Sequence, residues 1–249
     1  MENEAVPEES TGNAGNWPAS FFRTRRLDAD APSKPFGGAE EFAISPDGKF
    51  VVFSARDVGR EEAWSTNFDL FAVPFDGSAA PRAITAANRA WDTQPAFSPD
   101  GKTLAYLAMK VPGFEADRLR IVLMSWPDGP ARGLSEAWDR SPSSIAWAAD
   151  GRTIYAVADN LGQGSLFAVD VASGKVRTVL EKGTIKAISV APERIVYALE
   201  HLRSPAELYS VRPDGSDVTT LTRINAEKVA ATRMGEPEQF TFKGWNDET

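Results

Sequence analysis

The chain contains no cysteine and only one histidine among its 249 residues. The absence of cysteine excludes disulfide scaffolds, thiolate metal sites and cysteine nucleophiles. A single imidazole is too little for most catalytic zinc sites, and it could complete a Ser-His-Asp triad only if a serine and an aspartate lay beside it. No Gly-x-Ser-x-Gly elbow, phosphate loop, His-Glu-x-x-His pair or dinucleotide fingerprint occurs. The sequence therefore predicts a chain that is inactive alone and binds no cofactor and no metal.

Basic charge and long apolar runs are also scarce. Thirty-five acidic against 27 basic residues leave a formal net charge of −8, which argues against nucleic acid or a membrane surface as a partner. No apolar run approaches the roughly 18 residues of a membrane span. Residues 1–20 carry acids and no base, the reverse of a secretory signal. We expect a disordered acidic leader there and a soluble protein, with cytoplasm and periplasm both left open.

A turn sequence repeats along the chain. Ser-Pro-Asp-Gly followed by Lys occurs at 45–49 and 98–102, and weaker copies lie at 148–152 and 190–194. Each copy stands between two stretches rich in β-forming residues. Proline presets the first turn angle, aspartate bonds the turn backbone and glycine takes a positive φ. Each copy is therefore predicted to close a β-hairpin.

A second predicted hairpin follows each of these turns at a regular distance. Its glycines are Gly77, Gly129, Gly174 and Gly215, at intervals of 52, 45 and 41 residues. Two hairpins per interval make four short antiparallel strands, which is the period of a β-propeller blade. The alternative is a β-sandwich, but a sandwich has no reason to repeat one turn at this period. The sequence predicts an all-β fold of about four propeller blades.

Both ends of the chain extend beyond this pattern. Residues 21–35 are predicted to end a preceding blade, and residues 226–249 to form a linker and a first strand toward a further domain. The four blades are expected at about 36–85, 86–135, 136–183 and 184–225. We interpret the arc as a segment of a seven- or eight-bladed propeller. Because an open arc exposes blade faces, it needs a covering partner or the rest of a longer polypeptide.

Three segments carry a family resemblance. The Ser-Pro-Asp-Gly-Lys repeats resemble those shared by TolB-like proteins and the prolyl oligopeptidase family of serine peptidases. Residues 238–246, Glu-Gln-Phe-Thr-Phe-Lys-Gly-Trp-Asn, resemble the strand by which that family enters its α/β-hydrolase domain. Residues 60–67, Arg-Glu-Glu-Ala-Trp-Ser-Thr-Asn, are similar to the bacterial dipeptidyl- and acylaminoacyl-peptidase branch. The resemblance covers about residues 21–249 and implies the last half of the propeller, with the catalytic domain beyond Thr249.

In that family, the resemblance implies, the propeller caps the active site, restricts access to short or unfolded peptides and holds the free amine of the peptide. A carboxylate suits this task, because it pairs more strongly with an ammonium once water is excluded. Glu61 and Glu62 are the candidates, in a long insert between the second and third strands of the first blade. Trp64 adds apolar or cation–π contact. The alternative is a solvated loop that happens to carry two acids.

A Trp-Asp pair recurs before two predicted innermost strands, as Trp91-Asp92 and Trp138-Asp139. Such loops line one mouth of a propeller channel, so all four residues are candidates for substrate binding. The alternative is packing of Trp between blades, with Asp bonding a turn backbone. His201 follows a predicted strand in a loop between hairpins, where a structural or surface role is expected.

The sequence thus favours a non-catalytic propeller segment of a serine exopeptidase. Its expected partners are the peptide substrate and an α/β-hydrolase domain, in the same chain or in a second one. The alternative is a TolB-like propeller that acts as a protein–protein interaction module. A self-sufficient propeller lyase or glycosidase is a third reading, and it would need acid–base groups that converge in the channel.

Overall fold

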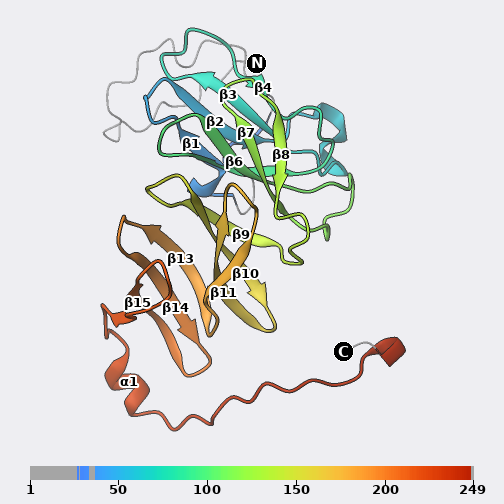
Figure 1. The fold of residues 1–249 in the computed structure, drawn as a ribbon. Coiled ribbons are helices and arrows are strands. Elements are labelled where there is room, and N and C mark those ends of the chain that lie inside the picture. Colours follow the sequence, from blue (N-terminus) through green and yellow to red (C-terminus); the bar gives the residue numbers. More distant parts are fainter. Residues whose placement is uncertain (1–26, 28, 34–36, 248–249) are drawn as a thin grey trace, which may run out of the picture.

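The chain folds into an arc of four-stranded antiparallel sheets (Figure 1). The structure is a computed structural model that describes residues 27, 29–33 and 37–247. Strands β1–β4 form the first blade and β5–β8 the second. The third blade, β9–β12, and the fourth, β13–β16, are joined by one parallel bridge between Gly164 and Thr184. The all-β propeller prediction is confirmed.

The strands follow one another in sheet order within each blade. Blade 1 contains β1 Phe42–Ile44, β2 Phe50–Ala55, β3 Asp69–Pro74 and β4 Arg82–Ala83; blade 2 contains β5 Asp92–Phe97, β6 Thr103–Ala108, β7 Arg120–Ser125 and β8 Ala131–Leu134. Blade 3 contains β9 Pro142–Trp147, β10 Thr153–Asn160, β11 Gln163–Asp170 and β12 Val176–Leu180; blade 4 contains β13 Thr184–Val190, β14 Ile195–His201, β15 Ser204–Val211 and β16 Thr219–Thr220. The short helices are η2 Ala39–Glu41, η3 Gly59–Ala63, α1 Ala226–Ala230 and η4 Trp245–Asp247.

The repeated tetrad closes the first hairpin of a blade by local hydrogen bonds. Ser45 Oγ donates to Asp47 Oδ1 at 2.7 Å and accepts the Phe50 amide at 2.9 Å. Gly48 has φ +70°, a backbone region that favours glycine. The tetrad at 98–101 repeats the same bonds and the same φ. The turn chemistry therefore accounts for the regular spacing of the strands.

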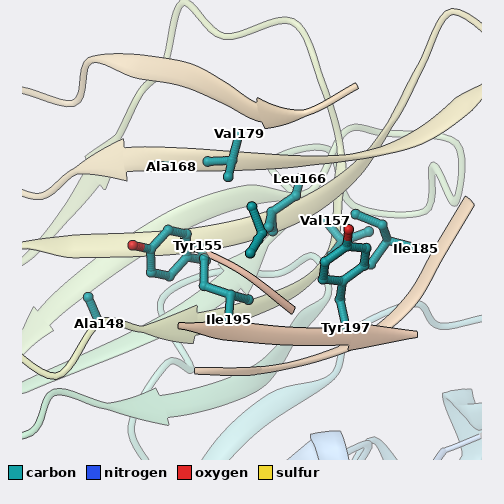
Figure 2. Packing of buried hydrophobic residues seen from close by; sticks show 10 residues of the cluster. Ala148, Tyr155, Val157, Leu166, Ala168, Val179, Ile185, Ile195 and Tyr197 are labelled. Atoms are coloured by element: carbon teal, nitrogen blue, oxygen red, sulfur yellow. The ribbon is translucent and has the colours of Figure 1, made fainter. Parts of the chain in front are cut away.

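The core lies between blades, because the middle strands bury both of their faces. In β6, Leu104 contributes to the cluster shared with blade 1 and Leu107 to the cluster shared with blade 3. In β10, Ile154 belongs to the blade 2 side, while Tyr155 belongs to the cluster with blade 4 that Figure 2 shows. Each fully buried aliphatic side chain contributes about 1.5–3 kcal/mol. The period-two alternation of the sequence thus stacks one blade on the next.

The structure describes little of the N-terminal end, so the leader and the preceding blade expected there stay predictions. Residues 1–20, and most of 21–35, lie outside the described residues. The strand expected at 239–245 does not form: after α1, residues 231–244 have no strand pairing, and Phe240 and Phe242 are exposed. Alternation alone cannot make a strand, because its amides and carbonyls need a neighbouring strand to bond. Within the described part of the chain, no helix has the length and apolarity needed to cross a membrane.

Candidate functional site

The candidate residues lie on one side of the arc, where the strands of every blade have the same set of ends. In a blade of four antiparallel strands, the turns after the first and third strands lie at one end and the other connections at the opposite end. We call this opposite end the connecting rim. It consists of residues 56–68, 84–91, 109–119 and 135–141, together with the ends of the β10–β11 and β14–β15 hairpins. All seven residues proposed for substrate binding from the sequence lie in or directly beside the rim.

The insert of blade 1 presents an exposed carboxylate and an exposed indole. Helix η3 carries Glu61 and Glu62, and Trp64 follows it with 70% of its surface exposed. Glu62 Oε1 lies 3.4 Å from Arg56 Nη2. Glu61 forms no ion pair with any of the described residues. Glu61 is therefore an exposed carboxylate that no cation of the described residues engages in an ion pair.

Arg56 and Phe68 connect this insert to Trp91. The Arg56 guanidinium carbon lies 5.0 Å from the centroid of the Phe68 ring. The Phe68 ring in turn stacks on Trp91 at 5.2 Å with an interplanar angle of 30°. The structure thus brings Glu62 and Trp91 into one cluster through two residues that the sequence analysis missed. Their only signal in the sequence is their position at the two ends of the insert.

Asp92 lies beneath this cluster and not on the surface. Its exposure is 0%, and its Oδ1 accepts Asn88 Nδ2 at 2.8 Å. Its Oδ2 accepts no hydrogen bond from the described residues. Burial raises the pKa of Asp92 to about 7. A substrate cannot reach this carboxyl in the present arrangement, so its surroundings favour an internal role.

Trp138 and Asp139 lie at the next blade junction. The Trp138 ring packs edge-on against Phe167 at 5.0 Å, and its carbonyl accepts a hydrogen bond from Arg118. The Asp139 side chain is 97% exposed and lies 3.7 Å from Arg140. Trp138 has the contacts of a packing residue, whereas Asp139 is solvated. No hydrogen bond, ion pair or ring contact among the described residues joins either of them to Glu61 or Glu62.

Each blade also projects an apolar side chain from the loop between its second and third strands. These side chains are exposed in all four blades: Trp64, Phe114, Leu161 and Leu202. All four side chains lie at the connecting rim of their blades. The sequence analysis missed this series because the loops share no motif.

His201 lines a hollow at the rim of blades 3 and 4. It ends β14 inside a hairpin, not in a loop between hairpins, and its Nδ1 accepts the Arg203 amide at 3.3 Å. The hollow of ≈1170 Å³ lies between the two hairpin ends and residues 234–239. Glu236 also lines it and pairs with Arg203. Within the described residues, no group of His, Asp and Glu is placed to hold a metal ion.

The fold and the rim define an arc of a β-propeller with carboxylate and aromatic side chains at one end. No protein-family model matches the chain. It is 38% identical over 148 residues to dipeptidyl-peptidase 5 of Arthroderma otae, covering 56% of this chain and 20% of that protein. It is 29% identical over 230 residues to the probable dipeptidyl-peptidase 5 of Aspergillus niger, covering 87% of this chain and 32% of that protein.

Solved structures show the same fold. Acylaminoacyl peptidase of Pyrococcus horikoshii matches with TM-score 0.60 and 21% identity, over 82% of this chain and 30% of that one. A TolB protein of Agrobacterium tumefaciens matches with TM-score 0.58 and 22% identity, over 72% and 63%. These comparisons confirm the resemblance to the propeller of prolyl oligopeptidase-family peptidases. The chain spans about a fifth to a third of the length of these two dipeptidyl-peptidases. Both come from fungi, so they give no support to the predicted bacterial branch.

Proposed function

We propose that the chain is a non-catalytic propeller segment of a serine exopeptidase that gates access to the active site and helps to bind the peptide N-terminus. The observation that carries the proposal is the exposed Glu61 carboxylate, next to the Glu62–Arg56 pair and Trp64 at the connecting rim. Similarity to proteins named dipeptidyl-peptidase 5 supports this substrate class.

Glu61, Glu62 and Trp64 each have a different role in binding the ammonium group of the peptide. Glu61 pairs with the charge, because it forms no ion pair with the described residues. Glu62 is partly neutralised and held by Arg56, so it acts as a weaker second acceptor. Trp64 offers a ring face to the ammonium or to the first side chain of the peptide. An exposed ion pair of this kind is worth about 0.2–1 kcal/mol and gains strength when water is excluded.

Exclusion of water requires a cover over the rim. The exposed apolar side chains of the four loops, Trp64 among them, provide a surface on which an α/β-hydrolase domain packs. Once covered, the rim admits only chains thin enough to pass the blades, which is the gating role. The domain is supplied in the same polypeptide or by a second chain.

Kinetics of the polypeptide that joins this chain to a hydrolase domain test the amine site. Glu61→Gln is expected to raise KM about tenfold for peptides with a free N-terminus, equivalent to about 1.4 kcal/mol. N-acetylated peptides keep their KM. Glu193→Gln removes an exposed carboxylate in the turn between β13 and β14, at the end of the blades opposite the rim, and serves as the matched control. An equal effect of Glu61→Gln on free and acetylated peptides rejects the amine site.

A TolB-like interaction module is the second candidate. Its support is the fold of the Agrobacterium protein together with the exposed apolar loops. Reading the gene beyond Thr249 separates the two functions. A nucleophile elbow followed by Asp and His supports the peptidase, whereas an unrelated domain or a stop codon supports the interaction module.

A further inference from the structure

Asp92 connects blade 1 to blade 2 through its backbone and its burial. Its amide donates to the Phe68 carbonyl at 2.8 Å, and its carbonyl accepts Ser54 Oγ at 2.8 Å. Both partners belong to blade 1 or its insert, while Asp92 itself begins the innermost strand of blade 2. Its side chain is fully enclosed at this junction.

The carboxyl has too few donors around it for a charged group. Asn88 Nδ2 donates to Oδ1, and the same nitrogen also donates to the Met109 carbonyl at 3.0 Å. Oδ2 receives no hydrogen bond from the described residues. An ionised carboxylate has about four acceptor sites, and a buried charge without a partner is strongly destabilising. The surroundings therefore suit the neutral acid.

The ionisable groups that face Asp92 reinforce this preference. Burial and the negative charge of Asp69, from β3, raise the pKa of Asp92, whereas Asn88 and Thr85 lower it by a smaller amount. The Thr85 hydroxyl donates to Asp69 Oδ1 at 3.3 Å. Tyr106, from β6, has a raised pKa because it is buried and lies near Asp92. Arg89 acts on Asp69, and Arg56 binds Glu62, so neither cation pairs with Asp92. Burial is the largest cause of the raised pKa of Asp92, which is about 7.

We propose that Asp92 is a proton-binding latch: as the neutral acid it fastens the junction of blades 1 and 2, and its ionisation loosens that junction and the adjoining rim. This inference stands on the buried geometry and does not depend on the proposed peptidase function.

The rim responds because Asp92 is bonded to the residues that shape it. The Met109 amide donates to the Trp91 carbonyl at 2.8 Å, and Trp91 stacks on Phe68 under Arg56. A carboxylate at position 92 draws water into this packing, and the contacts of Asp92 with Phe68 and Ser54 of blade 1 loosen together with the Trp91–Met109 bond. Since the folded pKa is raised, the stabilisation is complete below the unfolded pKa of about 3.9 and is lost as pH rises through about 7.

Urea unfolding of the 249-residue chain at pH 5.5 and pH 8.5 tests the latch. With a folded pKa of about 7, the folding constant is expected to fall about 30-fold between these two conditions. Asp92→Asn, which mimics the neutral acid, is expected to lose this dependence, whereas Asp139→Asn keeps it. Retention of the full pH dependence in Asp92→Asn overturns the proposal.

Two measurements on the unaltered chain test the proposal if Asp92→Asn folds poorly. The carboxyl carbon of Asp92, followed by NMR in the unaltered chain, is expected to titrate near 7, and titration near 4 overturns the proposal. The protection factor of the Met109 amide against hydrogen exchange is expected to be lower at pH 8.5 than at pH 5.5 in the unaltered chain. An equal protection factor at the two pH values would mean that ionisation does not loosen the rim and overturns the proposal. Activity enters neither test, so the proposed function stands or fails separately.

Discussion

The loop between β6 and β7 depends on a single carboxylate, Asp117. Its Oδ2 accepts the amides of Lys110 at 2.6 Å and Val111 at 3.0 Å. Its Oδ1 accepts the amide of Arg118 at 2.8 Å, and Arg120 Nη1 lies 3.2 Å from Oδ2. The Asp117 side chain is only 9% exposed. Asp117→Ala removes all of these bonds at once and leaves the Arg120 guanidinium without its carboxylate.

The loss of stability expected for Asp117→Ala follows from these contacts. Breaking a buried ion pair costs about 3–5 kcal/mol, and a hydrogen bond to a charged group contributes about 1.5–3 kcal/mol. The loop lies at the rim, where freed amides and Arg120 can reach water, so the lower end applies. We expect Asp117→Ala to reduce the free energy of unfolding by about 3 kcal/mol at pH 7.

The pH dependence supplies a second check on Asp117. Burial tends to raise its pKa, but the hydrogen bonds from Arg120 and the three backbone amides outweigh burial and hold the pKa well below its ordinary value. The stabilisation is therefore complete above the unfolded pKa of about 3.9 and is lost as the pH falls below it. The difference in the free energy of unfolding between Asp117→Ala and the unaltered chain should become smaller as the pH falls from 5 to 3.

Urea denaturation followed by circular dichroism measures the effect. Asp139→Asn, which removes a 97% exposed carboxylate, should change the free energy of unfolding by less than about 0.5 kcal/mol. If Asp117→Ala is no more destabilising than this control, the loop is held by other contacts and the reasoning is refuted.

The blade core and the repeated turn give two further predictions. Leu107→Ala, at a fully buried position between blades 2 and 3, should cost about 2–5 kcal/mol in urea unfolding, and a loss under 1 kcal/mol would mean that blades 2 and 3 are not packed as described. Gly101→Ala, at φ +70°, places a methyl group whose three nearest atoms belong to the Pro46 side chain at 3.5 Å or more. It should lower the free energy of unfolding by about 1–2 kcal/mol from the left-handed backbone alone. Gly101→Asn should cost less, because Asn tolerates that region, and the opposite order would place the strain elsewhere.

The fold could be predicted because its signals are local. Each Ser-Pro-Asp-Gly turn is closed by bonds that span at most five residues, as between Ser45 and Phe50. The alternation that places Leu104 and Leu107 on opposite faces of β6 is equally local. Because successive side chains of β6 point to opposite faces and both faces are apolar, blade 2 packs against a neighbour on each side. Local rules of this kind can be read from one sequence.

The candidate site was only partly predictable, because its environments depend on the connections. The two Trp-Asp pairs are identical in sequence, yet Asp92 is buried and Asp139 is solvated. Asp92 is the first residue of β5, whereas Asp139 lies three residues before β9 begins at Pro142. That difference in connection length decides whether the carboxyl enters the junction. The contacts of Arg56 with Phe68 and Glu62 likewise require the insert to fold back on blade 1.

Two enclosed carboxyls hold the same rim in opposite charge states. Asp117 is stabilised as the anion by Arg120 and backbone amides, and its contribution is lost below about pH 4. Asp92 is stabilised as the neutral acid, and its contribution is lost as the pH rises through about 7. The rim is therefore most firmly fixed between these limits. Outside them it loosens at different places: the loop of blade 2 in acid, and the junction beside Glu62 and Trp91 in base.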